Sequence, residues 1–164
     1  MYKLIGAVMI IAAGGLIGVQ KSAVLKYRCD NLQKLISALT LLENEISYGK
    51  TDIMNALYSI GKIQDFPLFA NAAENMRTLT ASDAFLKAAS DKNLYYSESD
   101  LEILRPLAEN LGMTGSTSQI KTLSHTVKLL ESVLAEAREK YEQNGRLYKN
   151  IGLLGGIFTA ILLF

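Results

Sequence analysis

Apolar residues gather at the two ends of this chain, and the middle alternates apolar with polar positions. Leu4 to Val19 is a run of 16 residues without a charged side chain, bounded by Lys3 and Lys21. Ile151 to Phe164 is a second run, of 14 residues, preceded by Lys149. Neither run has a polar face, and a helix that is apolar all round lies either inside a protein or in lipid. We therefore expect a membrane helix at each end.

Both runs are shorter than the roughly 20 residues that a spanning helix needs. At 1.5 Å per residue they cover roughly 24 and 21 Å of a hydrocarbon layer roughly 30 Å thick. The Lys21 stem can extend the first, and Tyr148 with Lys149 the second. One alternative is a pair of core helices in a soluble bundle, but a chain this short has difficulty burying both. A cleaved signal peptide is another, although no clear A-x-A site follows the first run.

The middle of the chain carries two apolar seams with steps of three and four residues, which is the a/d spacing of long packed helices. The first seam consists of Leu32, Leu35, Leu39, Leu42 and Ile46. The second consists of Ile120, Leu123, Val127, Leu130, Leu134, Ala137 and Tyr141. Because each seam adjoins a terminal run, we expect two long, nearly continuous, antiparallel helices over residues 4–48 and about 117–164.

Four shorter helices are expected between the long ones. Thr51 or Asp52 can cap the first of these, which should end near Gly61. Pro67 suits the first turn of the next. Ser82 can cap the third.

The stretch from Ser97 to Leu111 predicts the fourth short helix, with Pro106 as a kink or a break. The fold class is therefore all-α: a six-helix cytoplasmic bundle whose first and last long helices extend into N- and C-terminal membrane helices. The expected divisions are an N-terminal membrane helix (1–21), the bundle (22–149) and a C-terminal membrane helix (150–164).

Each terminal run contains a G-x-x-x-G spacing. Gly14 and Gly18 supply it in the first run, and Gly152 and Gly156 in the second. Small residues four apart let helix backbones approach closely in lipid. The spacing alone is a weak signal, but its presence in both runs favours packing of the two helices on each other or on a partner.

Flanking lysines and arginines predict the orientation, because they favour the cytoplasmic side. Lys3 alone lies outside the first run. Eight basic residues lie between the two runs, close to their inner ends: Lys21, Lys26, Arg28 and Lys34 after the first run, and Arg138, Lys140, Arg146 and Lys149 before the second. The bundle is therefore expected in the cytoplasm.

Composition offers little sign of chemistry. The net charge of +1 creates no basic field for nucleic acid. Common nucleotide, zinc and hydrolase motifs do not occur. The single histidine, His125, has no acid–base or metal partner three or four residues away, and the single cysteine, Cys29, has no histidine near it in sequence. We expect neither catalysis nor a cofactor nor a metal.

Four short motifs resemble the stage III sporulation protein AB family. They are Lys3-Leu4-Ile5-Gly6-Ala7, Glu45-Ile46-x-Tyr48-Gly49, Gln143-Asn144-Gly145-Arg146-x-Tyr148 and Gly152-x-Leu154-Gly155-Gly156. Each motif is weak alone, but their order covers essentially the whole chain. The resemblance implies a mother-cell membrane protein of endospore-forming bacteria, in the channel that joins the mother cell to the forespore.

The resemblance also implies a bundle similar to the cytoplasmic domain of the inner-membrane platform protein of type II secretion and type IV pilus machines. Such a platform would connect a cytoplasmic secretion-type ATPase, stage III sporulation protein AA, to other membrane subunits of the channel. Whether the chain also forms homo-oligomers is left open by its sequence. The expected contact tip comprises Glu45, Tyr48, Gly49, Lys50 and Asp52, together with residues 112–118. The expected membrane interface comprises Lys21, Asn144, Gly145, Arg146, Tyr148 and Lys149.

Two other classes stay open. A holin-like membrane-active protein also uses short glycine-rich spans, although the large middle domain argues against it. A membrane-tethered enzyme or interaction module is the other, and a pocket with converging polar groups would favour the enzyme. Asn144-Gly145 breaks helix propensity beside the second run, which suggests either a hinge or a tolerated weak point.

Overall fold

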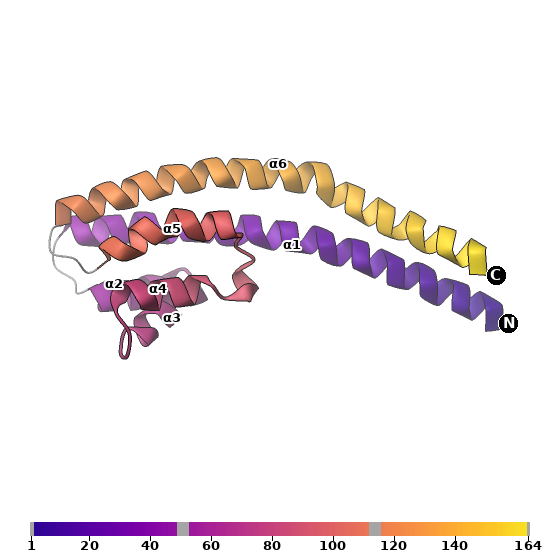
Figure 1. Ribbon diagram of the computed structural model, residues 1–164, viewed down its shortest axis with the longest axis horizontal. Helices are drawn as coiled ribbons and strands as arrows, with labels where there is room; N and C mark the ends of the chain where they lie inside the picture. The colour runs from indigo at the N-terminus through magenta and orange to yellow at the C-terminus, as the bar shows by residue number, and fades with distance from the viewer. Residues whose placement is uncertain (1, 49–52, 112–115, 164) are drawn as a thin grey trace. The chain divides into compact units, whose positions relative to one another are not determined.

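The chain is mostly helical in the part that the computed structural model describes, which is residues 2–48, 53–111 and 116–163 (Figure 1). Six α-helices and one 3-10 helix lie in these ranges, without a strand. They are α1 (Tyr2–Ser47), α2 (Ile53–Ile63), α3 (Pro67–Asn75), α4 (Ala81–Ala89), η1 (Lys92–Leu94), α5 (Glu98–Asn110) and α6 (Ser116–Leu163). The predicted all-α class and the two long terminal helices are confirmed.

Two compact units divide the chain, and α1 and α6 contribute to both. We call residues 1–29 with 136–164 the helix-pair unit, and residues 30–135 the bundle unit. The borders predicted at 21/22 and 149/150 describe where a membrane would end. The two units are defined by contacts within the chain, so they do not test that prediction.

The predicted seams form much of the bundle core. Leu32, Leu35, Leu39 and Leu42 of α1 are each 0% exposed, while Ile46 lies at intermediate depth. From α6, Leu123, Leu130 and Leu134 are buried. Full burial of a leucine side chain stabilises a fold by about 1.5–3 kcal/mol, so these positions explain why the two long helices join the bundle.

Gly61 lies where α2 and α3 approach each other closely. The helix α2 continues through Gly61 and ends at Ile63, two residues beyond the predicted end, and its predicted caps, Thr51 and Asp52, lie outside the described residues. A Cβ atom at Gly61 would lie 2.6 Å from the backbone nitrogen of Ala70 on α3. Glycine is therefore required here because the two helices approach closely, and the turn follows two residues later.

Aromatic rings continue the core from the start of α3 into α4. The rings of Phe66 and Phe69 lie 5.9 Å apart, and Phe85 meets Phe69 edge-on at 6.0 Å. Tilted and edge-to-face arrangements suit the charge distribution of aromatic rings. Pro67 occupies the first turn of α3, as predicted.

The cap of α4 is Thr80 rather than the predicted Ser82. The Thr80 hydroxyl accepts a hydrogen bond from the Asp83 amide at 3.2 Å and donates one to its carboxylate at 2.8 Å. Ser82 lies inside the first turn, so the helix begins one residue before it. The prediction missed that Thr80 places an acidic partner at the third helical position.

The connection from α4 to α5 contains η1, which the sequence did not predict. Asn31 of α1 donates a hydrogen bond to the Leu94 carbonyl at 3.0 Å, and the Tyr96 hydroxyl donates one to the Asn31 carbonyl at 3.1 Å. Ser97 caps α5, which lies within the stretch predicted to be helical, and Pro106 lies inside this helix without splitting it.

Candidate functional site

The terminal segments present apolar side chains outward. Each of α1 and α6 contains a stretch long and apolar enough to cross a membrane, and only 11% of the residues in that stretch are buried. In the helix-pair unit, Met9 is 68% exposed, Leu16 63%, Phe158 64% and Ile161 73%. Core helices of a soluble bundle would bury such residues, and an apolar surface of this kind signals contact with lipid or protein.

The four predicted glycines lie where α1 and α6 pack together within the helix-pair unit. A Cβ atom at Gly14 would lie 2.6 Å from the Gly152 carbonyl oxygen, and one at Gly152 would lie 2.5 Å from the Gly14 carbonyl oxygen. At Gly156 a Cβ atom would lie 3.0 Å from the Ile11 Cα, and at Gly18 it would overlap the Tyr148 carbonyl. This is the close backbone approach that small-xxx-small spacing permits.

The residues predicted at the membrane interface lie along the same pair. Gly145 is buried, and a Cβ atom there would lie 3.1 Å from both the Ser22 hydroxyl and the Tyr141 ring. Lys21, Arg146, Tyr148 and Lys149 are exposed, and Asn144 is half-buried. The helix α6 runs through Asn144-Gly145 without interruption, so packing against Ser22 gives a structural reason for glycine there.

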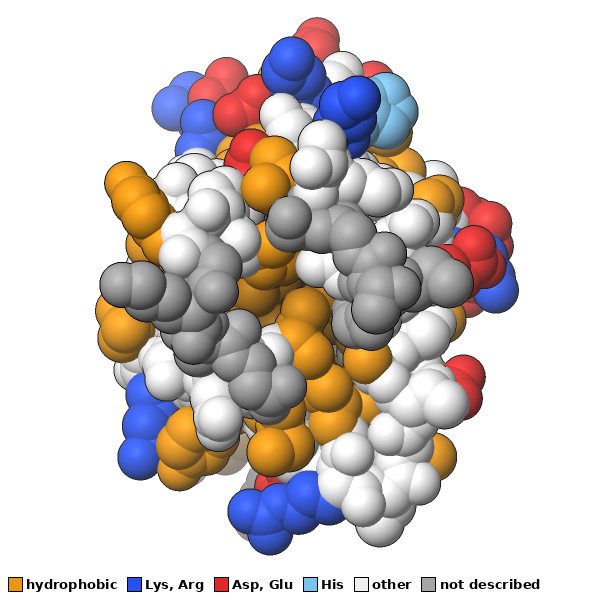
Figure 2. Space-filling view, turned by 90° about the vertical axis from the view of Figure 1, so that its left-hand side faces the viewer, with side chains coloured by type: hydrophobic (Ala, Val, Ile, Leu, Met, Phe, Trp, Pro, Cys, Tyr) orange, Lys and Arg blue, Asp and Glu red, His pale blue; other side chains and the backbone are white. Residues whose placement is uncertain are grey.

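The predicted contact tip is described only in part. Glu45 is exposed, and Tyr48 is 82% exposed just beyond the end of α1. Gly49, Lys50 and Asp52 lie outside the described residues. Figure 2 shows this end of the bundle unit, with hydrophobic side chains near its centre and charged groups around its edge.

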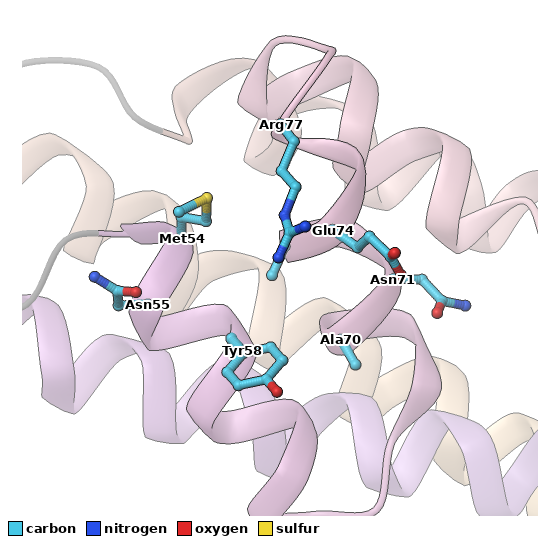
Figure 3. Close-up of a pocket in the computed structure, with 8 residues that line it drawn as sticks. Met54, Asn55, Tyr58, Ala70, Asn71, Glu74 and Arg77 are labelled. Carbon is cyan, nitrogen blue, oxygen red and sulfur yellow. The ribbon is translucent and has the colours of Figure 1, made fainter.

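A groove that the sequence analysis missed lies between α2 and α3, with a volume of about 520 Å³ (Figure 3). Its polar lining comes from Asn55 and Tyr58 on α2, and from Asn71, Glu74 and Arg77 on α3 and the turn after it. The spacing of three residues in Asn55–Tyr58 and Asn71–Glu74 was the available signal, because such residues share a helix face.

The groove has a polar character without a nucleophile among its lining residues. In Figure 3 Arg77 extends into the groove between the two helices. Lys62 places its Nζ atom 4.8 Å from the centre of the Tyr58 ring. Amide, carboxylate, phenol and guanidinium groups suit recognition of a polar surface. The lining contains neither serine nor cysteine nor histidine.

Two further residues that the sequence singles out have side chains capable of chemistry, and both lie in the described part of the chain. His125 is exposed on α6, whereas Cys29 is buried at 7% exposure. No group of three or more His, Cys, Asp or Glu side chains that could hold a metal ion occurs among the described residues.

Comparison with known proteins agrees with this architecture. The sequence profile of the stage III sporulation protein AB family matches residues 3–164. Stage III sporulation protein AB of Bacillus subtilis (strain 168) is 30% identical, and the alignment covers 99% of each chain. A solved structure of stage III sporulation protein AB aligns with a TM-score of 0.60 at 25% identity, over 70% of this chain and 96% of that one. The chain belongs to the stage III sporulation protein AB family, and its role is in sporulation.

Proposed function

We propose that this chain is a non-catalytic membrane platform of a secretion-like channel between mother cell and forespore. It is inserted in the mother-cell membrane around the forespore, and its bundle unit lies in the cytoplasm. There it holds a secretion-type ATPase, stage III sporulation protein AA, close to the membrane subunits of the channel.

One observation carries the proposal: α1 and α6 each run unbroken from an apolar terminal stretch into a folded helical bundle. An enzyme that needs only tethering is adequately served by one helix and a flexible linker. Two continuous helices instead make the bundle and the membrane segments parts of the same elements. Elements that are shared by a soluble unit and a membrane unit can carry coupling between the partners of the two.

The surface of the bundle unit supports a protein partner. Tyr48 is 82% exposed, Ile63 74% and Tyr58 49%. Tyrosine is enriched among the residues that dominate the binding energy of protein interfaces, because its ring buries a large area and its hydroxyl can still be hydrogen-bonded. The acidic Glu45, one turn before Tyr48, adds a charge that can select a basic partner surface.

Binding of the ATPase to the full chain in lipid nanodiscs tests the proposal. We expect Tyr48→Ala to weaken binding by about tenfold or more, as loss of an interface anchor does. Glu45→Lys is expected to slow association, with a steeper effect at low salt. Lys50→Glu probes the part of the tip outside the described residues. Glu131→Lys, a charge reversal at an exposed position of α6, is the matched control.

The outcomes separate the parts of the proposal. Weaker binding by the tip variants alone supports both the platform role and this contact surface. Equal binding by all variants keeps the platform role and overturns the tip as its contact. Absence of binding by the wild-type chain overturns the coupling to the ATPase.

A further inference from the structure

A hollow of about 500 Å³ lies within the helix-pair unit beside the C-terminal apolar run. Five of its lining residues come from α6 and one from α1: Tyr141, Glu142, Gly145, Arg146, Lys149 and Ser22. Lys149 stands two residues before the apolar run that begins at Ile151, and Ser22 stands three residues after the run that ends at Val19. Both helices thus enter their apolar stretches at the level of the hollow.

The floor of the hollow depends on Gly145. Ser22 is only 2% exposed, and a Cβ atom at Gly145 would come within 3.1 Å of its hydroxyl oxygen and of the Tyr141 ring. Because Gly145 has no side chain, the Ser22 and Tyr141 side chains can approach the α6 backbone here. The hollow is therefore formed by specific packing at the glycine.

The charges around the hollow leave a net positive lining. Arg146 and Lys149 are three residues apart, so they share a face of α6, and both are exposed. Neither forms an ion pair within the described ranges, 2–48, 53–111 and 116–163. Glu142 is the single carboxylate in the lining, and it stands four residues before Arg146. Two cations and one carboxylate leave a charge of one positive unit for a ligand to neutralise.

We propose that this hollow binds the phosphodiester headgroup of an anionic membrane lipid such as phosphatidylglycerol. A guanidinium matches two phosphate oxygens at once, and an ammonium adds a compact positive charge. Ser22 and Tyr141 also line the hollow, and each carries a hydroxyl group. Basic pockets between membrane helices on the cytoplasmic side are suited to anionic lipid headgroups.

Glu142 sets the expected charge of the ligand. A phosphodiester carries one negative charge, which matches the net charge of the lining. A phosphate monoester approaches two negative charges, and the second would be repelled by the Glu142 carboxylate. The hollow should therefore prefer phosphatidylglycerol to phosphatidic acid and to inorganic phosphate.

This inference rests on the membrane insertion in the proposed function, so the experiment first tests insertion. The full chain is reconstituted in vesicles of phosphatidylcholine and phosphatidylglycerol, and resistance to alkaline extraction is scored. The inserted protein is then released in mild detergent, and native mass spectrometry counts the phosphatidylglycerol molecules that it retains. Extraction by alkali would contradict the membrane placement itself.

Two double variants carry the comparison. We expect Arg146→Gln with Lys149→Gln to reduce retention by about tenfold or more, since charge-assisted hydrogen bonds are lost. Lys26→Gln with Lys140→Gln removes the same charge at exposed positions of the helix-pair unit that do not line the hollow, and retention should change little. Equal losses in both double variants would show general attraction to an anionic surface and overturn the site.

Two further arms identify the ligand. Inorganic phosphate added at millimolar concentration should leave the retained lipid in place, and displacement would reassign the hollow to free phosphate. Glu142→Gln should increase retention of phosphatidic acid relative to phosphatidylglycerol. An unchanged preference in this variant would contradict the charge argument for a phosphodiester.

Discussion

Asp100 is a carboxylate in the interior of the bundle unit, with 0% exposure. It accepts a hydrogen bond from the Ser97 amide at 2.8 Å, and the Ser97 hydroxyl accepts one from the Asp100 amide at 3.3 Å. These two hydrogen bonds form a capping box at the start of α5. We expect Asp100→Ala to lower the free energy of unfolding by about 2 kcal/mol, measured by urea unfolding in detergent micelles.

Glu98 offers a matched control for that substitution. It lies in the same first turn of α5 but is exposed. Glu98→Ala should change the free energy of unfolding by less than about 0.5 kcal/mol. Similar losses in both variants would mean that Asp100 acts only through the helix dipole, and not through its buried hydrogen bonds.

Tyr96 gives the bundle an expected sensitivity to alkali. Burial chiefly, and the nearby Asp100 carboxylate in addition, raise the pKa of the Tyr96 phenol well above its ordinary value. The folded chain keeps this proton where the unfolded chain releases it. The phenol's contribution is therefore complete below about pH 10 and declines above it, by about 1.4 kcal/mol per pH unit.

Tyr96→Phe removes the titratable hydroxyl group and keeps the aromatic ring, so it distinguishes the effect of the phenol proton from that of ring packing. At neutral pH the variant should be about 1 kcal/mol less stable, because the hydrogen bond to the Asn31 carbonyl is lost. Above about pH 10 its unfolding free energy should fall less steeply than that of the wild type, so the two curves converge. Chemical unfolding across this range measures both slopes, and parallel curves would contradict the prediction.

Single residues were predicted well where their role is local. Ser97 and Pro67 were recognised as helix starts because a cap or an N-terminal proline acts within its own turn. The burial of Asp100 and the helix contact of Gly61 depend on neighbours distant in sequence. A glycine at the end of a helix and one that meets another helix look alike in a single sequence.

At the scale of elements, the glycines of the helix pair make the sharpest prediction. Gly14 and Gly152 face each other's backbone, whereas a Cβ atom added at Gly15 or Gly155 would meet no neighbouring atom within 4 Å. Gly14→Ala or Gly152→Ala must push the helices apart. Gly15→Ala and Gly155→Ala add a methyl group in open space and favour the helix slightly.

Thermal unfolding of the full chain in micelles compares the two pairs of variants. Substitution at a facing position should cost about 1–3 kcal/mol, as overpacking does. Substitution at an open position should be neutral or stabilising by a few tenths of a kcal/mol. If all four variants behaved alike, the close approach of α1 and α6 would not contribute to stability.

The long helices were predicted because their apolar residues recur at a regular spacing, whereas η1 and the groove have no such pattern in the sequence. The steps of three and four identified α1 and α6 because apolar burial along a whole helix repeats in the sequence. The helix η1 is only three residues long and is held by Asn31 from another element, so it leaves no period. The groove between α2 and α3 likewise depends on how two short helices pack.

For the whole molecule, the proposed cytoplasmic placement of the bundle can be tested by labelling. Basic residues flank the inner ends of both apolar runs, which favours retention of these ends on the cytoplasmic side. In a Cys29→Ser background, Glu131→Cys places a thiol at an exposed position of the bundle unit, and Leu163→Cys places one at the end of α6, where Leu163 is 64% exposed.

In intact spheroplasts of cells that express the chain outside sporulation, and so carry it in the surface membrane, a membrane-impermeant maleimide should label Leu163→Cys, and should label Glu131→Cys only after the membrane is opened. Both thiols should react equally in detergent, which controls for local accessibility. Labelling of Glu131→Cys in intact cells would reverse the proposed orientation. If Leu163→Cys also required opened membranes, the short second helix would enter the bilayer without crossing it, because 14 apolar residues cover only roughly 21 Å of a layer roughly 30 Å thick.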